Sequence, residues 1–190
     1  MLIVSGGDLV GKSTFVKLAY DELNRRGYHH MPHHLTKPPA NFDYYRDYLD
    51  MIHPRSIWDR FALDCLAYRQ LDDIPCSMTP MKWSLVEAAC RHKGGFQVVL
   101  TCHRDDTIRE RYAKARHGQY HMYDVEHAVK VNKIFRDMRS NDSTIMRDGF
   151  YKVNIDIGVT TDCDDRDGWM LEVIDAYCQH YSQWTATNAG

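Results

Sequence analysis

Short apolar runs alternate with amphipathic stretches along most of the chain. The apolar runs predict strands at residues 2–5, 30–35, 56–58, 96–101 and 151–155. Between and after them, apolar positions recur at helical spacing, which predicts helices at 12–26, 44–51, 62–70, 81–92, 107–115, 124–139 and 167–181. Strands that alternate with helices are typical of a parallel sheet covered on both faces. The pattern therefore predicts a three-layer α/β/α fold with a five-stranded parallel sheet.

The first predicted strand runs directly into a glycine-rich turn, Gly6-Gly7-Asp8-Leu9-Val10-Gly11-Lys12-Ser13. This turn matches the phosphate-binding pattern G-x-x-x-x-G-K-S/T at every specified position, and a predicted helix follows it as the pattern requires. Two glycines let the backbone curl until successive N–H groups point at one anion, and the helix adds its positive N-terminal dipole. The turn predicts a P-loop NTPase fold that binds a nucleoside triphosphate, and we take ATP as this cofactor. The residues expected to bind the triphosphate are Gly6, Gly7, Asp8, Gly11, Lys12, Ser13 and Thr14.

Lys12 and Ser13 of this turn are expected to contact the phosphates and a metal ion, and a second motif, Asp59-Arg60, is expected to lie nearby. Lys12 would reach the β- and γ-phosphates, and the Ser13 hydroxyl would hold Mg²⁺. The predicted strand 56–58 ends in Asp59-Arg60. Arg60 can clamp a phosphate through two parallel N–H···O bonds, and Asp59 can hold Mg²⁺ or accept a proton. A structural ion pair is the alternative, but the nearby phosphate-binding turn favours catalytic roles for Lys12, Asp59 and Arg60.

These residues carry a resemblance to a known family. The turn with Asp8 at its third position, and the stretch Asp59-Arg60-Phe61 followed by Leu66-Ala67-Tyr68, resemble thymidylate kinases. Thr36-Lys37-Pro38-Pro39 with Tyr44-Tyr45 is similar to short phage-type deoxynucleoside monophosphate kinases. The resemblance implies that Asp8 lies near the acceptor sugar, that Arg60 binds the acceptor phosphate, and that Tyr68 lines the base pocket. Lys37, at the end of the second strand, is placed to touch the acceptor; the alternative is a lysine of a loop with no such role.

The chain departs from the thymidylate kinase pattern at three positions. It has Ser5 where that family usually has Glu, Asp64 where it usually has Ser, and Arg69 where it usually has Gln. The glutamine belongs to the base pocket in that family, so Arg69 is expected at the substrate, and specificity for thymine stays open.

A stretch rich in arginine and lysine follows the predicted strand 96–101 and covers residues 104 to about 123. It resembles the helical lid of nucleoside and nucleotide kinases, whose arginines fold over the transferring phosphoryl group and stabilise its charge. Arg109 and Arg116 lie two turns apart on one face, so both are expected to be catalytic. Glu110 and Asp106 supply opposite charges, so a solvated helix face is the alternative.

The nature of the acceptor is the main open question. A phosphate acceptor needs cations rather than a base, whereas a hydroxyl acceptor benefits from a carboxylate. Thr36-Lys37-Pro38 supplies a cation at the second strand end, which favours a deoxynucleoside monophosphate, dTMP-like or with a modified pyrimidine. The alternatives are a deoxynucleoside kinase, a phage kinase acting on 5-hydroxymethyluracil in DNA, or a non-enzymatic nucleotide-dependent switch or assembly ATPase.

Composition narrows the class further. The 190 residues fit one domain spanning residues 1–190, and a net charge of −2 makes binding to nucleic acid unlikely. Six scattered cysteines, with no secretory leader and no long apolar stretch, indicate free thiols in a cytoplasm, that of a host cell if the chain is phage-encoded. The irregular cluster His29, His30, His33 and His34 is interpreted as a polar, half-exposed segment rather than a zinc site. A homodimer is possible because many relatives form one.

Overall fold

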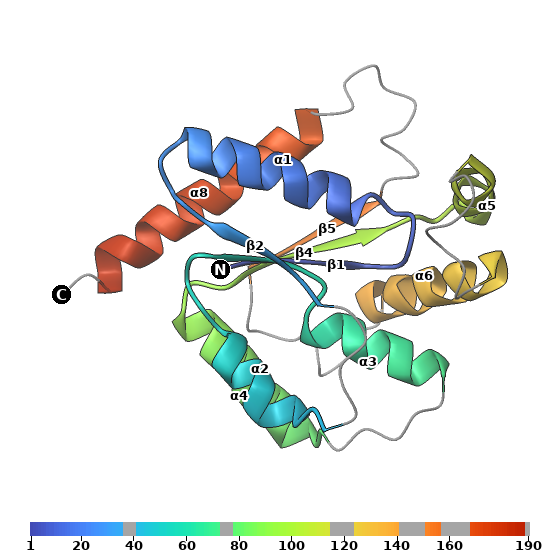
Figure 1. Ribbon diagram of the computed structural model, residues 1–190, viewed down its shortest axis with the longest axis horizontal. Helices are drawn as coiled ribbons and strands as arrows, with labels where there is room; N and C mark the ends of the chain where they lie inside the picture. The colour runs from blue at the N-terminus through green and yellow to red at the C-terminus, as the bar shows by residue number, and fades with distance from the viewer. Residues whose placement is uncertain (36–40, 73–77, 115–123, 141–150, 157–167, 189–190) are drawn as a thin grey trace.

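A computed structural model describes residues 1–35, 41–72, 78–114, 124–140, 151–156 and 168–188 (Figure 1). The strands in this part of the chain are β1 (Leu2–Gly6), β2 (Met31–His34), β3 (Ser56–Asp59), β4 (Phe96–Thr101) and β5 (Tyr151–Asp156). The helices are α1 (Lys12–Arg25), α2 (Tyr44–Met51), α3 (Ala62–Leu71), α4 (Pro80–His92), α5 (Asp105–Lys114), α6 (Val125–Ser140) and α8 (Gly168–Asn188). None of the helices within these ranges is long and apolar enough to cross a membrane.

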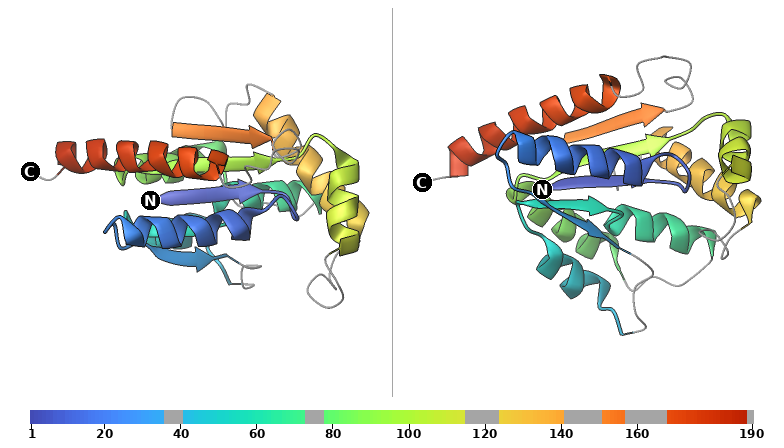
Figure 2. Two further views of the ribbon diagram at one scale, coloured as in Figure 1. Left: turned by 90° about the horizontal axis from the view of Figure 1, so that it is seen from above. Right: turned by 45° about the horizontal axis from the view of Figure 1, so that its top comes forward.

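The strands form one parallel sheet in the order β2-β3-β1-β4-β5. The central strand β1 has β3 on one side and β4 on the other, so the chain order reverses at β1. Ligands of open α/β sheets bind at such a switch point, outside the carboxyl ends of the strands. The glycine-rich turn after β1 lies at this end, and α5 lies beyond the tips of the strands (Figure 2).

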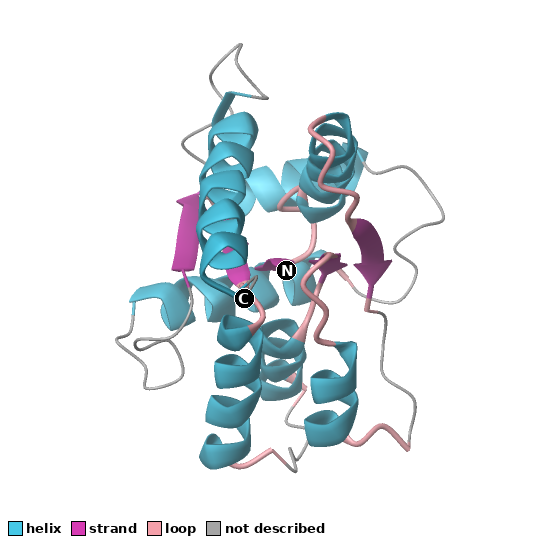
Figure 3. Cartoon of the chain, turned by 90° about the vertical axis from the view of Figure 1, so that its left-hand side faces the viewer, coloured by secondary structure: helices cyan, strands magenta, loops and turns pink. Residues whose placement is uncertain are grey.

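Helices cover both faces of the sheet, as the alternating pattern predicted (Figure 3). Leu2 and Val4 of β1 pack with α1 and α8 in one core, which includes Phe15. Ile3 faces the opposite side and packs with α2 and α4 in a second core, which includes Trp83. A third cluster joins α3 and α6 on the same side as α4 (Figure 1). Because successive strand residues point to opposite faces, a sheet buried on both sides reads as a continuous apolar run.

The predicted elements agree closely with the observed ones, apart from the last helix and one histidine. Helix α8 continues to Asn188, seven residues beyond the predicted end at 181. His30 is not half-exposed as predicted: it is buried, and its Nε2 lies 2.6 Å from the Tyr177 hydroxyl of α8. Its Nδ1 lies 3.1 Å from the Tyr28 carbonyl oxygen. His30 thus joins the segment before β2 to the long terminal helix.

Burial of His30 makes stability depend on pH. Desolvation, with a smaller contribution from the nearby Met1 amino group, lowers the pKa of His30 to about 4. The unfolded chain therefore binds this proton more readily than the folded protein, and stability falls as the pH falls from about 6.5 towards 4. We expect a loss of roughly 2 kcal/mol over this interval, measured by urea unfolding. The variant His30→Gln should be less stable at neutral pH, and its free energy of unfolding should fall less between pH 6.5 and 4. An equal fall in both proteins would show that other groups cause the pH dependence.

Candidate nucleotide-binding site

The glycine-rich turn is shaped by close approaches that only glycine permits. A Cβ atom on Gly6 would lie 2.3 Å from the Leu100 carbonyl oxygen of β4, and Gly6 has a φ of 146°. Gly11 has a φ of 91° and begins α1 in the left-handed conformation. A Cβ atom on Gly7 would lie 3.0 Å from the Cα atom of Asn132 in α6. The turn is therefore held between β4 and α6, and its backbone N–H groups can converge as anion binding requires.

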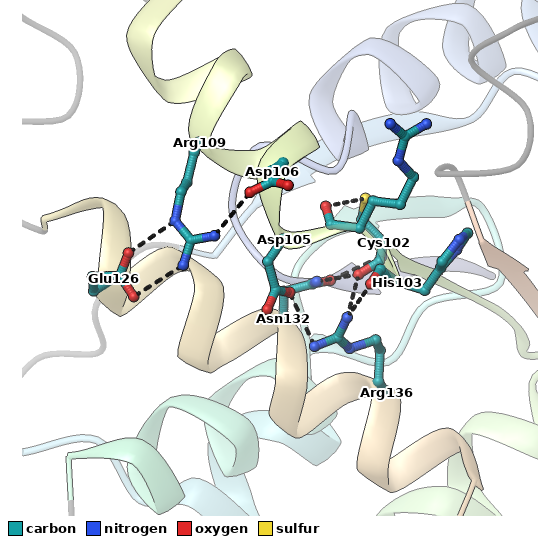
Figure 4. A network of polar contacts seen from close by, with 9 residues as sticks. Cys102, His103, Asp105, Asp106, Arg109, Glu126, Asn132 and Arg136 are labelled. Atoms are coloured by element: carbon teal, nitrogen blue, oxygen red, sulfur yellow. Dashed lines mark hydrogen bonds and ion pairs between the residues drawn. The ribbon is translucent and has the colours of Figure 1, made fainter.

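Asn132 is a site residue that sequence reasoning missed. Its side chain is fully buried in α6; its oxygen accepts a hydrogen bond from the Cys102 amide at 2.9 Å, and its nitrogen donates to the Cys102 carbonyl (Figure 4). Arg136, one turn further on, donates to the carbonyls of Cys102 and His103 and pairs with Asp105. These contacts fix α6 to the end of β4, beside Gly7. The available signal was a single polar residue on the apolar face of a predicted helix.

Lys12 and Ser13 lie where the phosphate-binding pattern places them, at the start of α1. Lys12 Nζ donates to the carbonyl oxygens of Gly6 and Gly7, at 2.8 and 2.5 Å. Burial lowers the pKa of Lys12, and the nearby Arg60 guanidinium lowers it further, against the opposing effect of neighbouring carboxylates. The ammonium group is thus held inside the turn by backbone oxygens, in a position from which it can move to a phosphate.

Ser13 joins the turn to the end of β3. Its hydroxyl donates to Asp59 Oδ2 at 2.7 Å. Within the described part of the chain, the other carboxylate oxygen, Asp59 Oδ1, is buried without a hydrogen-bond partner. A buried carboxylate oxygen needs a partner, and a hydroxyl beside a carboxylate supplies the oxygen ligands that Mg²⁺ prefers. The two predicted metal ligands therefore fit a magnesium ion. The described residues include no group of three or more His, Cys, Asp and Glu side chains suited to a metal.

Asp8, Arg60 and Tyr68 come together although they lie on three different segments. Arg60 Nη2 donates to Asp8 Oδ1 at 2.5 Å, and the Arg60 guanidinium carbon lies 5.1 Å from the centre of the Tyr68 ring. Burial opposes the charge of Arg60, but Tyr68 and the surrounding carboxylates outweigh it and raise the pKa of Arg60. Burial also raises the pKa of Tyr68, so its hydroxyl stays protonated. Arg60 Nε is buried with no partner among the described residues, which leaves one N–H for a ligand.

The backbone at Arg60 is held in an unusual conformation. Its φ of 74° lies in the left-handed region, which costs a non-glycine residue about 1–2 kcal/mol. The Arg60 amide donates to the Val4 carbonyl of β1 at 3.0 Å, so the central strand fixes this conformation. Backbone strain of this kind is concentrated at functional sites.

Asp64 connects the glycine-rich turn to the Asp59-Arg60-Phe61 motif. One carboxylate oxygen accepts from the Gly6 amide at 3.2 Å, and the other from the Phe61 amide at 3.0 Å. The Ser5 hydroxyl also hydrogen-bonds to Asp64, and it accepts from Gln97 at 3.1 Å. Burial raises the pKa of Asp64. Two departures from the thymidylate kinase pattern, Ser5 and Asp64, are therefore in contact: the carboxylate is on α3 and the hydroxyl on β1, the reverse of the usual assignment in that family.

The remaining predicted site residues lie in different places. Arg109 pairs with Glu126 and Asp106 between α5 and α6 (Figure 4). Its neighbour Arg111, which sequence reasoning did not single out, is the α5 arginine that contacts the turn: Nη1 donates to the Leu9 carbonyl at 2.9 Å.

Of three further residues predicted to lie at the site, the structure describes one. Arg69 lies on α3 with its guanidinium carbon 4.5 Å from the centre of the Tyr44 ring. Lys37 and Arg116 lie outside the described residues, as does the part of the predicted lid from 115 to 123.

The fold and the site define the class: this is an α/β fold with a parallel sheet, whose first strand ends in a turn that matches the phosphate-binding sequence pattern. No protein-family model matches the chain, and no curated protein matches it in sequence. Among solved structures, the YorR protein from Bacillus subtilis, crystallised in complex with phosphorylated GDP, has a similar fold. The two chains superpose with a TM-score of 0.69 over 92% of this chain and 94% of YorR, at 18% sequence identity.

Because the turn approaches β4 closely at Gly6 but not at Gly11, substitution of these two glycines should reduce stability by different amounts. We expect Gly6→Ala to reduce the free energy of unfolding by more than 3 kcal/mol, because its Cβ would clash with the Leu100 carbonyl. Gly11→Ala should cost only about 1 kcal/mol, because no atom of the described residues beyond its immediate neighbours lies within 4 Å of its Cβ position and only the left-handed φ is unfavourable. Urea denaturation measures both values; similar losses would show that the approach to β4 does not constrain the turn.

Proposed function

We propose that the protein is an ATP-dependent kinase that transfers the γ-phosphoryl group of ATP to a deoxynucleoside monophosphate. The observation that carries this proposal is the contact between Asp8 and Arg60. It places an arginine with an unused, buried N–H directly beside the phosphate-binding turn. A kinase needs a donor site and an acceptor site in contact, and these two residues join them. A dTMP-like or modified pyrimidine nucleotide is the acceptor we favour.

The donor half consists of the turn and the residues that follow it. The backbone amides of residues 7–13 would surround the phosphates of ATP, and Lys12 would move from the carbonyls of Gly6 and Gly7 to the β- and γ-phosphates. Ser13 and Asp59 would hold Mg²⁺, which neutralises phosphate charge when bound. Thr14 completes the first helical turn. These groups stabilise the charge that spreads over the transferring phosphoryl group.

The acceptor half is centred on Arg60. Its guanidinium group would hold the acceptor phosphate in line with the bond that breaks, while Asp8 fixes its orientation and would accept a hydrogen bond from the sugar. The attacking phosphate oxygen is already ionised, so the transfer needs no base. Tyr68 would limit the space for the base, and Arg69 and Lys37 are proposed to contact the acceptor from either side.

We propose that the arginines of α5 and of the segment after it form the lid that closes over the reacting groups. Arg111 already reaches the turn and is our first candidate for contact with the transferring phosphoryl group; Arg109 and Arg116 are the candidates proposed from sequence. Positive groups at this position lower the barrier electrostatically and, on closure, exclude water from the nucleotide.

The structural comparison supports a nucleotide as ligand but does not bear on the base. YorR was crystallised with phosphorylated GDP. We further propose that residues 1–190 form one domain, because every described strand belongs to the same sheet. A homodimer in the cytoplasm, that of a host cell if the chain is phage-encoded, acting on a free nucleotide rather than on nucleic acid, completes the proposal.

A panel of acceptors tests the reaction. With ATP and Mg²⁺, phosphate should be transferred to a deoxynucleoside monophosphate, measured by chromatography of the products. Lys12→Ala should reduce this transfer by at least about a thousandfold, whereas Lys17→Ala, on the exposed side of the same helix, should leave it unchanged. Phosphate found only on deoxynucleosides or on DNA containing 5-hydroxymethyluracil would replace the proposed acceptor by one of the hydroxyl acceptors.

The role of Arg60 predicts a selective effect on the two substrates. Arg60→Ala should raise the KM for the acceptor nucleotide about 10- to 100-fold, because a charge-assisted phosphate contact is lost. The KM for ATP should change less than about threefold. Steady-state kinetics with each substrate varied in turn gives both values, and Arg91→Ala on the exposed surface of α4 is the control. An unchanged acceptor KM in Arg60→Ala would contradict the assignment of Arg60 to the acceptor.

A further inference from the structure

His34, the last residue of β2, lies beside the residues proposed to hold the magnesium ion. The parallel register places His34 directly opposite Asp59 of β3. His34 Nδ1 lies 3.2 Å from Asp59 Oδ2, the same oxygen that accepts a hydrogen bond from the Ser13 hydroxyl at 2.7 Å. A hydroxyl of α1 and an imidazole nitrogen of β2 therefore both lie within 3.2 Å of one carboxylate oxygen of β3, at the carboxyl end of the sheet.

The spacing of these atoms suits a common metal ion. In octahedral coordination with bonds of about 2.1 Å, neighbouring ligand atoms are about 3 Å apart. The two observed separations, 2.7 and 3.2 Å, lie on either side of this value. The His34 side chain is 51% exposed, so an ion can approach it without the opening of a buried core. Asp59 Oδ1, buried and without a partner among the described residues, provides a further acceptor on the same carboxylate.

We propose that His34 supplies a nitrogen ligand to this cation site. The inference rests on the proposed function, because that proposal assigns Ser13 and Asp59 to the cation. It adds a consequence for metal preference: imidazole suits transition metals, whereas magnesium prefers oxygen ligands. The site then binds Mn²⁺ or Co²⁺ more tightly than a site built from a hydroxyl and a carboxylate alone.

The neighbouring residue His33 provides a matched control. Successive strand residues point to opposite faces of a sheet. The His33 ring accordingly stacks on Trp58, with ring centres 4.6 Å apart, on the face away from Ser13. His33→Gln and His34→Gln thus make the same chemical change at adjacent exposed positions of one strand, and only the second removes a donor atom from the proposed site.

The experiment measures metal binding rather than turnover. Mn²⁺ and Mg²⁺ are titrated calorimetrically into each protein with the β,γ-methylene analogue of ATP, whose bridge carries no nitrogen. We expect His34→Gln to weaken Mn²⁺ binding about tenfold and Mg²⁺ binding less than threefold, and His33→Gln to change neither. Electron spin echo spectra of bound Mn²⁺ should show coupling to a protein nitrogen in the wild type and in His33→Gln. The coupling should change on ¹⁵N labelling of the protein and be absent in His34→Gln.

Two results would overturn the proposal: no protein nitrogen coupling in the wild type, or Mn²⁺ affinity equal in the wild type and in His34→Gln. Circular dichroism of each variant checks that it is folded. A parallel titration of Mn²⁺ without nucleotide separates this inference from the kinase proposal. If the protein fails to bind the ATP analogue but shows His34-dependent Mn²⁺ binding, the proposed function fails and the cation site stands.

Discussion

The buried carboxylate of Asp64 is the constraint on which the site depends. A carboxylate removed from water is unfavourable unless hydrogen bonds replace its hydration. Here the replacements come from the amides of Gly6 and Phe61 and from the Ser5 hydroxyl. The first amide begins the phosphate-binding turn, and the second follows Arg60. One side chain of α3 therefore sets the separation of the proposed donor and acceptor halves, and any movement of α3 shifts one half against the other.

The charges around this carboxylate bear on how the proposed site would hold two anions. Lys12 is buried and Arg60 half-buried close to Asp8, Asp59 and Asp64, and these carboxylates raise the pKa of both cations against the effect of burial. In this arrangement the cations are satisfied by backbone carbonyls and carboxylates, which keeps a buried charge from standing alone. In the proposed function, phosphates would compete for the same cations, and a divalent ion at Asp59 would offset part of the added negative charge. Binding of the proposed substrates would therefore replace ion pairs within the protein by contacts with the ligand.

Periodicity and the two motifs predicted most of the architecture, because strands buried on both faces and amphipathic helices leave strong local patterns. The resemblance to thymidylate kinases also anticipated the proximity of Asp8, Arg60 and Tyr68. The contacts that were missed depend on packing between distant segments. Asn132 meets the turn through α6, Arg111 reaches Leu9 across more than a hundred residues, and His30 is buried only because α8 lies over it. Apart from the single polar residue on the apolar face of α6, no local pattern records these approaches.

The position of Arg69 bears on the open question of the base. On α3, Asp64 and Tyr68 are four residues apart and so lie on one face, directed towards the turn and Arg60. Arg69, one residue further, is rotated by about 100° and lies over the Tyr44 ring of α2. The family that this chain resembles usually has an amide side chain there, which both donates and accepts hydrogen bonds. A guanidinium group only donates, and its contact with Tyr44 orients it. A base read at this position would therefore need to offer acceptor atoms, a requirement that a thymine carbonyl and an oxygen-bearing modified pyrimidine both meet.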